Sequence, residues 1–92
     1  MYTTWKYPLK VQAQQTISIP RNSTMLTVQV QGDTPCLWVQ VDTDEPSDDV
    51  IIRTFGTGHE MPNDPGEYVS TYQELGGSLV WHVFWDWAES GS

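Results

Sequence analysis

Apolar and polar residues alternate with a period of two along most of this chain, and no stretch of useful length shows the spacing of an amphipathic helix. The clearest alternation lies in residues 25–31 and 36–42, which are separated by the turn-forming residues 32–35. This pattern places Leu26, Val28 and Val30 on one face of the first segment. We therefore expect these two segments to form a β-hairpin.

Similar short segments follow one another at close spacing, and they predict an all-β domain. The expected fold is a small antiparallel sandwich or open barrel of six to seven strands. In residues 67–73 the alternation places Tyr68, Ser70 and Tyr72 on one face. Residues 78–85 are apolar on both faces, so we expect this strand to be central or covered on both sides. The expected strands are residues 3–7, 16–19, 25–31, 36–42, 50–55, 67–73 and 78–85.

Residues 1–92 are expected to form one domain, with an acidic loop at 43–49 and a frayed tail at 86–92. So short a chain buries a marginal core, which association of subunits would enlarge, so we expect a homo-oligomer. Trp87, beyond the last expected strand, is a candidate for a contact between subunits.

Several classes of protein are disfavoured. The single cysteine, Cys36, excludes an intramolecular disulfide framework. His59 and His82 lack the spacing of a known metal site, so we expect neither a metal nor a cofactor. No apolar run approaches the about 18 residues of a membrane span, and the chain does not start like a signal peptide. We therefore expect an intracellular protein that does not enter a membrane.

The distribution of charge limits the possible partners. All twelve Asp and Glu residues lie from Asp33 onward, where Arg53 is the only Lys or Arg. A formal net charge of −8 argues against general binding of nucleic acid, because counterion release requires a basic surface. The acidity suits either a solvated surface or a protein that presents carboxylates to a basic partner.

The densest binding chemistry lies in residues 53–59, Arg-Thr-Phe-Gly-Thr-Gly-His. Gly56 and Gly58 permit backbone conformations in which successive N–H groups form an anion-binding nest. Arg53 would supply a forked cation and His59 a group that titrates near neutral pH. The irregular stretch that follows is long for a small β domain, as functional loops often are. A hairpin connection that needs glycines, beside a solvated arginine, would explain the same residues.

The aromatic residues divide into two groups. Trp81 and Trp85 alternate with apolar residues and are expected in the core. Trp38 faces away from the apolar side of its strand, and Trp5 and Tyr7 share a face of a strand flanked by lysines. Aromatic rings in such positions either cover another subunit or stack on a planar ligand.

Few residues are arranged for catalysis. Cys36 and the serines have no base at a recognisable spacing. The paired carboxylates within residues 44–49 lie in a solvated loop with nothing apolar nearby to raise a pKa. His59 near Arg53 suits a phosphodiester, but neither a second base nor a metal-ligand cluster accompanies it. We therefore expect a binding protein rather than an enzyme.

A series of short motifs resembles a family of small proteins found widely in phage and prophage genomes, and the likeness runs from about Trp5 to Phe84. The family has no known activity. Small accessory phage proteins often act in counter-defence, by sequestering a host immune nucleotide or by blocking a nuclease complex. The resemblance implies a location in the cytoplasm of an infected bacterial host. The motifs are WKY at 5–7, QTISIP at 15–20, VQVQ at 28–31, LW at 37–38, FGTGH at 55–59 and GGSLVWHVF at 76–84.

Two functions from different classes follow. The first is a nucleotide sponge, in which an oligomeric β domain binds a cyclic oligonucleotide or related signal without cleaving it. Arg53 would pair with phosphate, residues 56–58 would line the anion, His59 would add a donor and Trp38 or Trp5 would stack on a base. The expected ligand-binding residues are Trp5, Tyr7, Trp38, Arg53, Phe55, Gly56, Thr57, Gly58 and His59.

The second function is a protein inhibitor of a host defence complex, in which acidic residues occupy a basic nucleic-acid channel. Asp42, Asp44, Glu45, Asp48 and Asp49 would supply the charge, and affinity should fall steeply with added salt. A phage structural or assembly component remains a third possibility, in which the aromatic residues serve only contacts between subunits.

Overall fold

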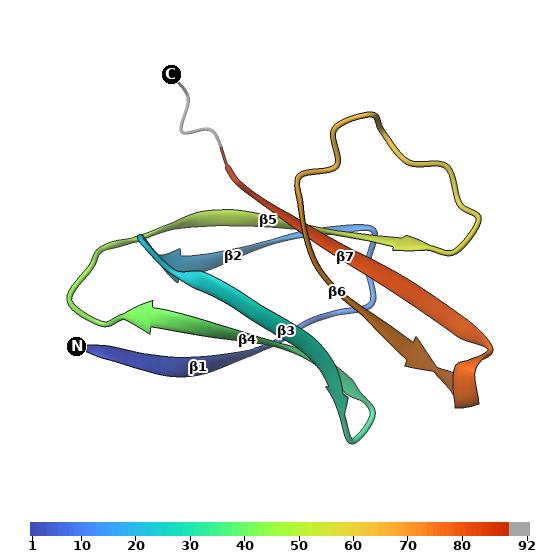
Figure 1. Ribbon diagram of the computed structural model, residues 1–92, viewed down its shortest axis with the longest axis horizontal. Helices are drawn as coiled ribbons and strands as arrows, with labels where there is room; N and C mark the ends of the chain where they lie inside the picture. The colour runs from blue at the N-terminus through green and yellow to red at the C-terminus, as the bar shows by residue number, and fades with distance from the viewer. Residues whose placement is uncertain (89–92) are drawn as a thin grey trace.

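The computed structural model of the chain describes residues 1–88 and confirms the all-β expectation (Figure 1). A single 3-10 turn, Leu75–Gly77, precedes the last strand, where the sequence has its paired glycines. No helix within residues 1–88 is long and apolar enough to cross a membrane. The strands are β1 (Tyr2–Pro8), β2 (Gln14–Pro20), β3 (Thr24–Gln31), β4 (Thr34–Asp42), β5 (Ser47–Gly56), β6 (Glu67–Glu74) and β7 (Leu79–Trp87).

The strands form two antiparallel sheets, one with the order β1-β4-β3 and the other with the order β2-β5-β7-β6. The expected hairpin is present as β3 and β4, and β7 is an interior strand, as its two apolar faces predict. The sheets approach each other where β3 lies against β6. There the Ser70 hydroxyl donates to the Val28 carbonyl at 3.2 Å. On the other side β1 and β2 remain separate edges, so the fold is a sandwich and not a closed barrel.

The core lies between the two sheets and consists mainly of branched aliphatic side chains, as the inward positions of alternating strands require. Trp81, Trp85 and Trp87 pack against it from β7 while keeping part of their surface exposed. The core residues are Leu9, Ile19, Val28, Leu37, Val39, Val41, Val50, Ile52, Tyr72 and Val83.

A β-bulge in β3 overturns the expectation that Leu26 lies on the same face as Val28 and Val30. Met25 pairs with Val39 and Thr27 with Trp38, so Leu26 is the extra residue. Leu26 is consequently 46% exposed, whereas Val28 is fully buried. Val30 keeps the face of Val28 but is 37% exposed near the end of the strand. Met25 packs against the core in place of Leu26.

A second register shift, in β6, separates Tyr68 from Ser70 and Tyr72, which were expected on one face. Tyr68 pairs with Phe84, but Ser70 pairs with Val83, so Val69 is the extra residue. Tyr68 therefore lies on the outer face of the four-stranded sheet, and Tyr72 is buried between the sheets.

The acidic loop is shorter than expected, because β5 begins at Ser47, three residues earlier than predicted, while β4 ends at Asp42 as expected. Asp48 and Asp49 belong to β5, where Asp49 pairs with Ser18 of β2. Their polarity did not prevent strand formation, because residues at the end of a sheet keep their side chains in solvent.

The frayed tail expected at 86–92 is wrong for residues 86–88. β7 extends to Trp87, and the Ala88 N–H donates to the Asp49 carbonyl at 2.9 Å. The Trp85 and Trp87 rings meet edge to face with centroids 5.5 Å apart. Trp87 is thus part of the last strand and not beyond it. Residues 89–92, for which fraying was also expected, lie outside the described residues.

The long irregular stretch after β5 is a crossover connection. β5 and β6 both pair antiparallel with β7, one on each side, so they run parallel to each other. Parallel strands cannot be joined by a tight turn, because the chain must return to the starting end of the sheet. Residues 57–66 make this return and form the large loop at the upper right of Figure 1. The topology alone therefore accounts for the length of this loop.

Candidate functional site

The stretch from Arg53 to His59 divides between the two faces of the four-stranded sheet. Alternation along β5 directs Ile52 and Thr54 toward the core and Arg53 and Phe55 toward the outer face. On that outer face Arg53 pairs with Phe84 of β7. The residues that were expected to form one anion site therefore do not all lie on one face of the sheet.

Arg53 makes its contacts within its own chain. Its Nη1 donates to the Pro65 carbonyl at 3.2 Å and lies 3.9 Å from Asp86 Oδ2. The side chain is 23% exposed. Arg53 therefore ties the end of the crossover loop to the outer face of the sheet, and part of its charge is balanced by Asp86.

Phe55 belongs to an aromatic cluster on the same outer face. Its ring meets Phe84 edge to face at 5.8 Å, and Phe84 meets Tyr68 in the same manner at 5.5 Å. The bulge in β6 is what brings Tyr68 to this face. Phe55 and Phe84 are half-buried and Tyr68 is exposed.

A line of hydrogen bonds runs beside these rings. The Thr57 hydroxyl lies 2.8 Å from His82 Nε2, and the Thr71 hydroxyl lies 3.0 Å from His82 Nδ1. The Tyr68 hydroxyl continues the line, 2.7 Å from that of Thr71. Both ring nitrogens of His82 are thus occupied, and the imidazole connects the start of the crossover loop to β6. Thr57, an expected ligand residue, is engaged in this connection.

His59 turns to the opposite side of the sheet. Gly56 faces inward, opposite Trp81 of β7, and a Cβ at Gly56 would lie 2.8 Å from His59 Cε1. The His59 and Trp81 rings meet edge to face with centroids 6.3 Å apart. The chain makes this reversal through Gly58, whose φ of 84° is a conformation that glycine adopts readily.

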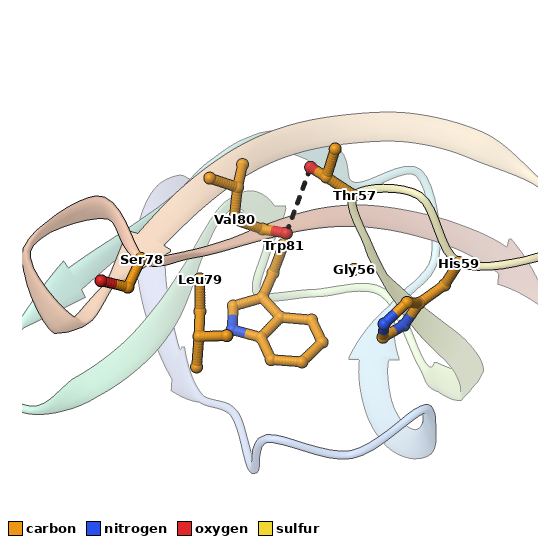
Figure 2. Close-up of a pocket in the computed structure, with 7 residues that line it drawn as sticks. All are labelled: Gly56, Thr57, His59, Ser78, Leu79, Val80 and Trp81. Carbon is orange, nitrogen blue, oxygen red and sulfur yellow. Dashed lines mark hydrogen bonds between the residues drawn. The ribbon is translucent and has the colours of Figure 1, made fainter.

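His59 and Trp81 line a pocket of about 300 Å³ at this end of the sandwich (Figure 2). The figure shows the indole of Trp81 between the side chains of Leu79 and His59. Ser78 and Thr57 also line the pocket, although the Thr57 hydroxyl is engaged by His82. The orientation of the indole is held by a hydrogen bond from its Nε1 to Glu74 Oε1 at 2.7 Å.

A second pocket, of about 270 Å³, adjoins the first and shares His59 and Trp81 with it. Its other lining residues are Thr54 of β5 and residues 11–13, which connect β1 to β2. We call the two pockets together the His59–Trp81 hollow. It offers an aromatic surface and an imidazole, but none of its lining residues is a lysine or an arginine.

The remaining expected ligand residues lie elsewhere. Trp38 is half-buried on the outer face of the three-stranded sheet, between Lys6 and Thr27. Trp5 and Tyr7 share a face, as expected, but it is the inward face of the edge strand β1, where Trp5 remains 42% exposed. Burial raises the pKa of the Tyr7 phenol. None of the three lines the His59–Trp81 hollow.

Of the nine expected ligand residues, the hollow brings together only Gly56, Thr57 and His59. The sequence reasoning missed Trp81 as a lining residue, because its alternation with apolar residues is the pattern of a core side chain. It also missed residues 11–13, which carry no distinguishing motif. Within residues 1–88 no group of three or more His, Cys, Asp or Glu side chains is placed to hold a metal ion.

These features define a small two-sheet β domain with an aromatic-walled hollow at one end. The chain belongs to a domain family of unknown function, DUF7352, whose model matches residues 1–91. No curated protein and no solved structure shows significant similarity to it.

Proposed function

We propose that this chain is a binding protein that holds a small nucleotide in the His59–Trp81 hollow and sequesters it without cleaving it. The observation that carries the proposal is the pair of adjoining pockets with His59 and Trp81 as their shared wall. Their combined size is within the range of small-ligand sites, roughly 300–1,000 Å³.

The lining suits the base and sugar of a nucleotide better than its phosphates. An indole presents a flat apolar surface for a heterocycle, and base–aromatic stacking contributes about 1–3 kcal/mol per base. The imidazole of His59 is a suitable partner for a polar edge, whereas the Thr57 hydroxyl is already engaged by His82. A planar heterocycle with a polar rim is therefore the ligand chemistry that this hollow favours.

The phosphates would lie toward Lys10 rather than Arg53. Lys10 is exposed and directly precedes Val11, which lines the second pocket. Arg53 lies on the other face of the sheet and contacts Pro65. This arrangement revises the expected role of Arg53 while keeping the expected role of His59.

The biological setting rests on the resemblance to phage and prophage proteins. In that setting the ligand is a host immune nucleotide, such as a cyclic oligonucleotide, and the protein acts in the cytoplasm of an infected bacterium. Sequestration requires no catalytic group, and a stoichiometric binder of this kind relieves a defence response by lowering the free concentration of the signal.

The alternative, an acidic inhibitor of a basic channel, has less support from the geometry. Asp42 and Asp44 hold the amino group of Met1 at 3.1 and 2.8 Å. Asp48 pairs with Arg21. Of the five acidic residues expected to mimic nucleic acid, most therefore already have partners within the chain. Glu45 also has one, since it accepts a hydrogen bond from the Asn22 side-chain amide.

The proposal is tested by mixing the purified protein with cyclic dinucleotides, cyclic trinucleotides and linear nucleotides. Tryptophan fluorescence and thermal shift report binding, since a ligand that binds only the folded state raises the melting temperature. The protein is then denatured and the released nucleotide analysed. Recovery of the intact nucleotide is expected, whereas a cleaved product would show that the protein is an enzyme.

His59→Ala is expected to abolish the fluorescence and thermal responses, because it removes one of the two side chains that form the shared wall of the hollow. Tyr68→Ala is the matched control, since it removes an aromatic residue from the outer face of the same sheet. Equal loss in both variants would place the site elsewhere. No response to any nucleotide would contradict the proposal and direct the search to a protein partner, by pull-down from infected cells.

A further inference from the structure

The edge strand β2 has one side that pairs with no strand within residues 1–88. Alternate residues of an antiparallel strand direct both backbone groups to the partner. The Thr54 N–H donates to the Ala13 carbonyl at 3.0 Å, and the pairing of β2 with β5 continues this register. Odd-numbered residues of β2 therefore face β5. The N–H and C=O groups of Gln14, Thr16 and Ser18 point away from the sheet.

At each end of this open edge, the outward backbone N–H group is either missing or already hydrogen-bonded within the chain. Pro20 has no N–H, and its carbonyl accepts a hydrogen bond from the Ser23 hydroxyl. At the other end, the Gln12 N–H donates to the Lys10 carbonyl at 3.0 Å. The available donors and acceptors of the edge are therefore arranged symmetrically about Thr16.

β2 lacks the features that usually protect an edge strand from pairing. It has no charged side chain, no bulge and no proline before its last residue. Of the other edge strands, β1 carries Lys6 near its middle, β6 begins and ends with a glutamate, and β3 contains a bulge and lies against β6. In a chain of formal net charge −8, an uncharged edge strand is the place where two copies can approach with little repulsion.

We propose that β2 pairs antiparallel with β2 of a second copy of this chain, about a two-fold axis at Thr16. The two sheets then form one continuous sheet across the dimer. Thr16 lies opposite the partner's Thr16, and Gln14 lies opposite the partner's Ser18. All the outward backbone groups of these residues are paired in this register. A shift by two residues would leave some of them unpaired, because the Gln12 N–H is already engaged.

The charges beside β2 favour a second copy over a foreign strand. In the pairing with β5, Gln14 lies next to Arg53 and Ser18 lies next to Asp49. The two-fold axis therefore places Arg53 of one copy in the same cross-strand row as the partner's Asp49. The row carries opposite charges at its two ends, and the equivalent row on the other side of the axis repeats the arrangement. The charges are three strand spacings, about 14 Å, apart, so the attraction is weak at physiological salt but has the sign that favours a second copy.

Disulfide trapping tests both the interface and its register. Residues opposite each other in a hydrogen-bonded pair have Cα atoms about 5.5 Å apart, a separation that a disulfide spans. Thr16→Cys is expected to form a covalent dimer rapidly in the absence of reductant, while the buried Cys36 does not compete. Gln14→Cys and Ser18→Cys are expected to cross-link slowly when alone and rapidly when mixed.

Thr4→Cys is the matched control. Thr4 is the middle one of the residues of β1 whose backbone N–H and C=O groups point away from β4, as Thr16 is for β2. Light scattering of the unmodified protein is expected to give twice the mass of one chain. Thr16→Lys should reduce the measured mass to that of one chain, since like charges would then face each other across the interface. Its circular dichroism spectrum should be unchanged.

Three results would each overturn the proposal. They are a monomeric unmodified protein at every concentration, cross-linking of Thr4→Cys as fast as that of Thr16→Cys, and no acceleration on mixing Gln14→Cys with Ser18→Cys. The test uses no nucleotide, so its outcome is independent of the function proposed for the His59–Trp81 hollow.

Discussion

Arg53 and His59 lie on opposite sides of the four-stranded sheet, although both belong to one short polar stretch. Arg53 pairs with Phe84 on the outer face, whereas the His59 ring packs against Trp81 at the inward side. The two residues therefore have separable roles, one in holding the crossover loop and the other in forming the hollow.

Replacing Arg53 with Gln should loosen the crossover loop without unfolding the domain. The variant loses a charged donor to the Pro65 carbonyl, so unfolding should become easier by about 1 kcal/mol. Hydrogen exchange in residues 57–66 should accelerate. Lys6→Gln, on the outer face of the other sheet, is the control. Loss of nucleotide binding in Arg53→Gln, with loop exchange unchanged, would restore Arg53 to the ligand site.

Gly56→Ala should perturb the hollow at little cost in stability. The new methyl group would lie 2.8 Å from His59 Cε1, and that exposed side chain can move aside. It would also lie 3.2 Å from Trp81 Cζ3, so the indole has to shift slightly. We expect altered tryptophan fluorescence and weaker ligand binding, with a melting temperature close to that of the unmodified protein.

Gly66→Ala, at the far end of the crossover loop, provides the contrasting substitution. Its φ of 102° is unfavourable for alanine, and a Cβ there would collide with the Trp85 carbonyl. The backbone conformation alone should cost about 1–3 kcal/mol of unfolding free energy. Equal stability of the two alanine variants, measured by denaturant unfolding, would contradict the described path of the loop.

The bulge in β3 predicts unequal effects of one substitution at two leucines. Leu37 is fully buried, so Leu37→Ala should lower the unfolding free energy by about 2–5 kcal/mol. Leu26 is displaced to the surface by the bulge, so Leu26→Ala should cost about 0.5 kcal/mol or less. Denaturant unfolding of both variants measures the difference. A large loss at Leu26 would mean that the strand keeps the regular alternation instead.

Tyr72 predicts a loss of stability at alkaline pH. Burial, together with the charge of Glu74, raises the pKa of its phenol from 10 to about 12. The folded state thus holds a proton that the unfolded state releases, so this contribution is complete below pH 10 and disappears as the pH rises through about 12.

Tyr72→Phe should remove this part of the pH dependence in unfolding measurements. Tyr2→Phe, which removes an exposed phenol, is the control. An identical alkaline profile for the unmodified protein and Tyr72→Phe would refute the assignment.

Much of the fold was predictable from local pattern. A strand buries every second side chain, so alternation identified the β3–β4 hairpin and the interior position of β7. Two bulges limited this reasoning. One extra residue reverses the alternation, and nothing in the local pattern marks Leu26 or Val69 as that residue.

The candidate site was only partly predictable. Glycines and polar residues marked the end of β5, and the loop that follows proved to be long, as expected. Its length, however, follows from the placement of β7 between β5 and β6, which depends on pairing between distant segments.

The sequence by itself determined the β character of the chain, the uncharged nature of β2 and the concentration of polar groups at 53–59. Only the tertiary structure decided that Arg53 contacts the crossover loop, that His59 meets Trp81, and that β2 lies at an edge. The physical reason is that alternation sets which side of its own strand a residue occupies, whereas strand order and bulges set what lies opposite it.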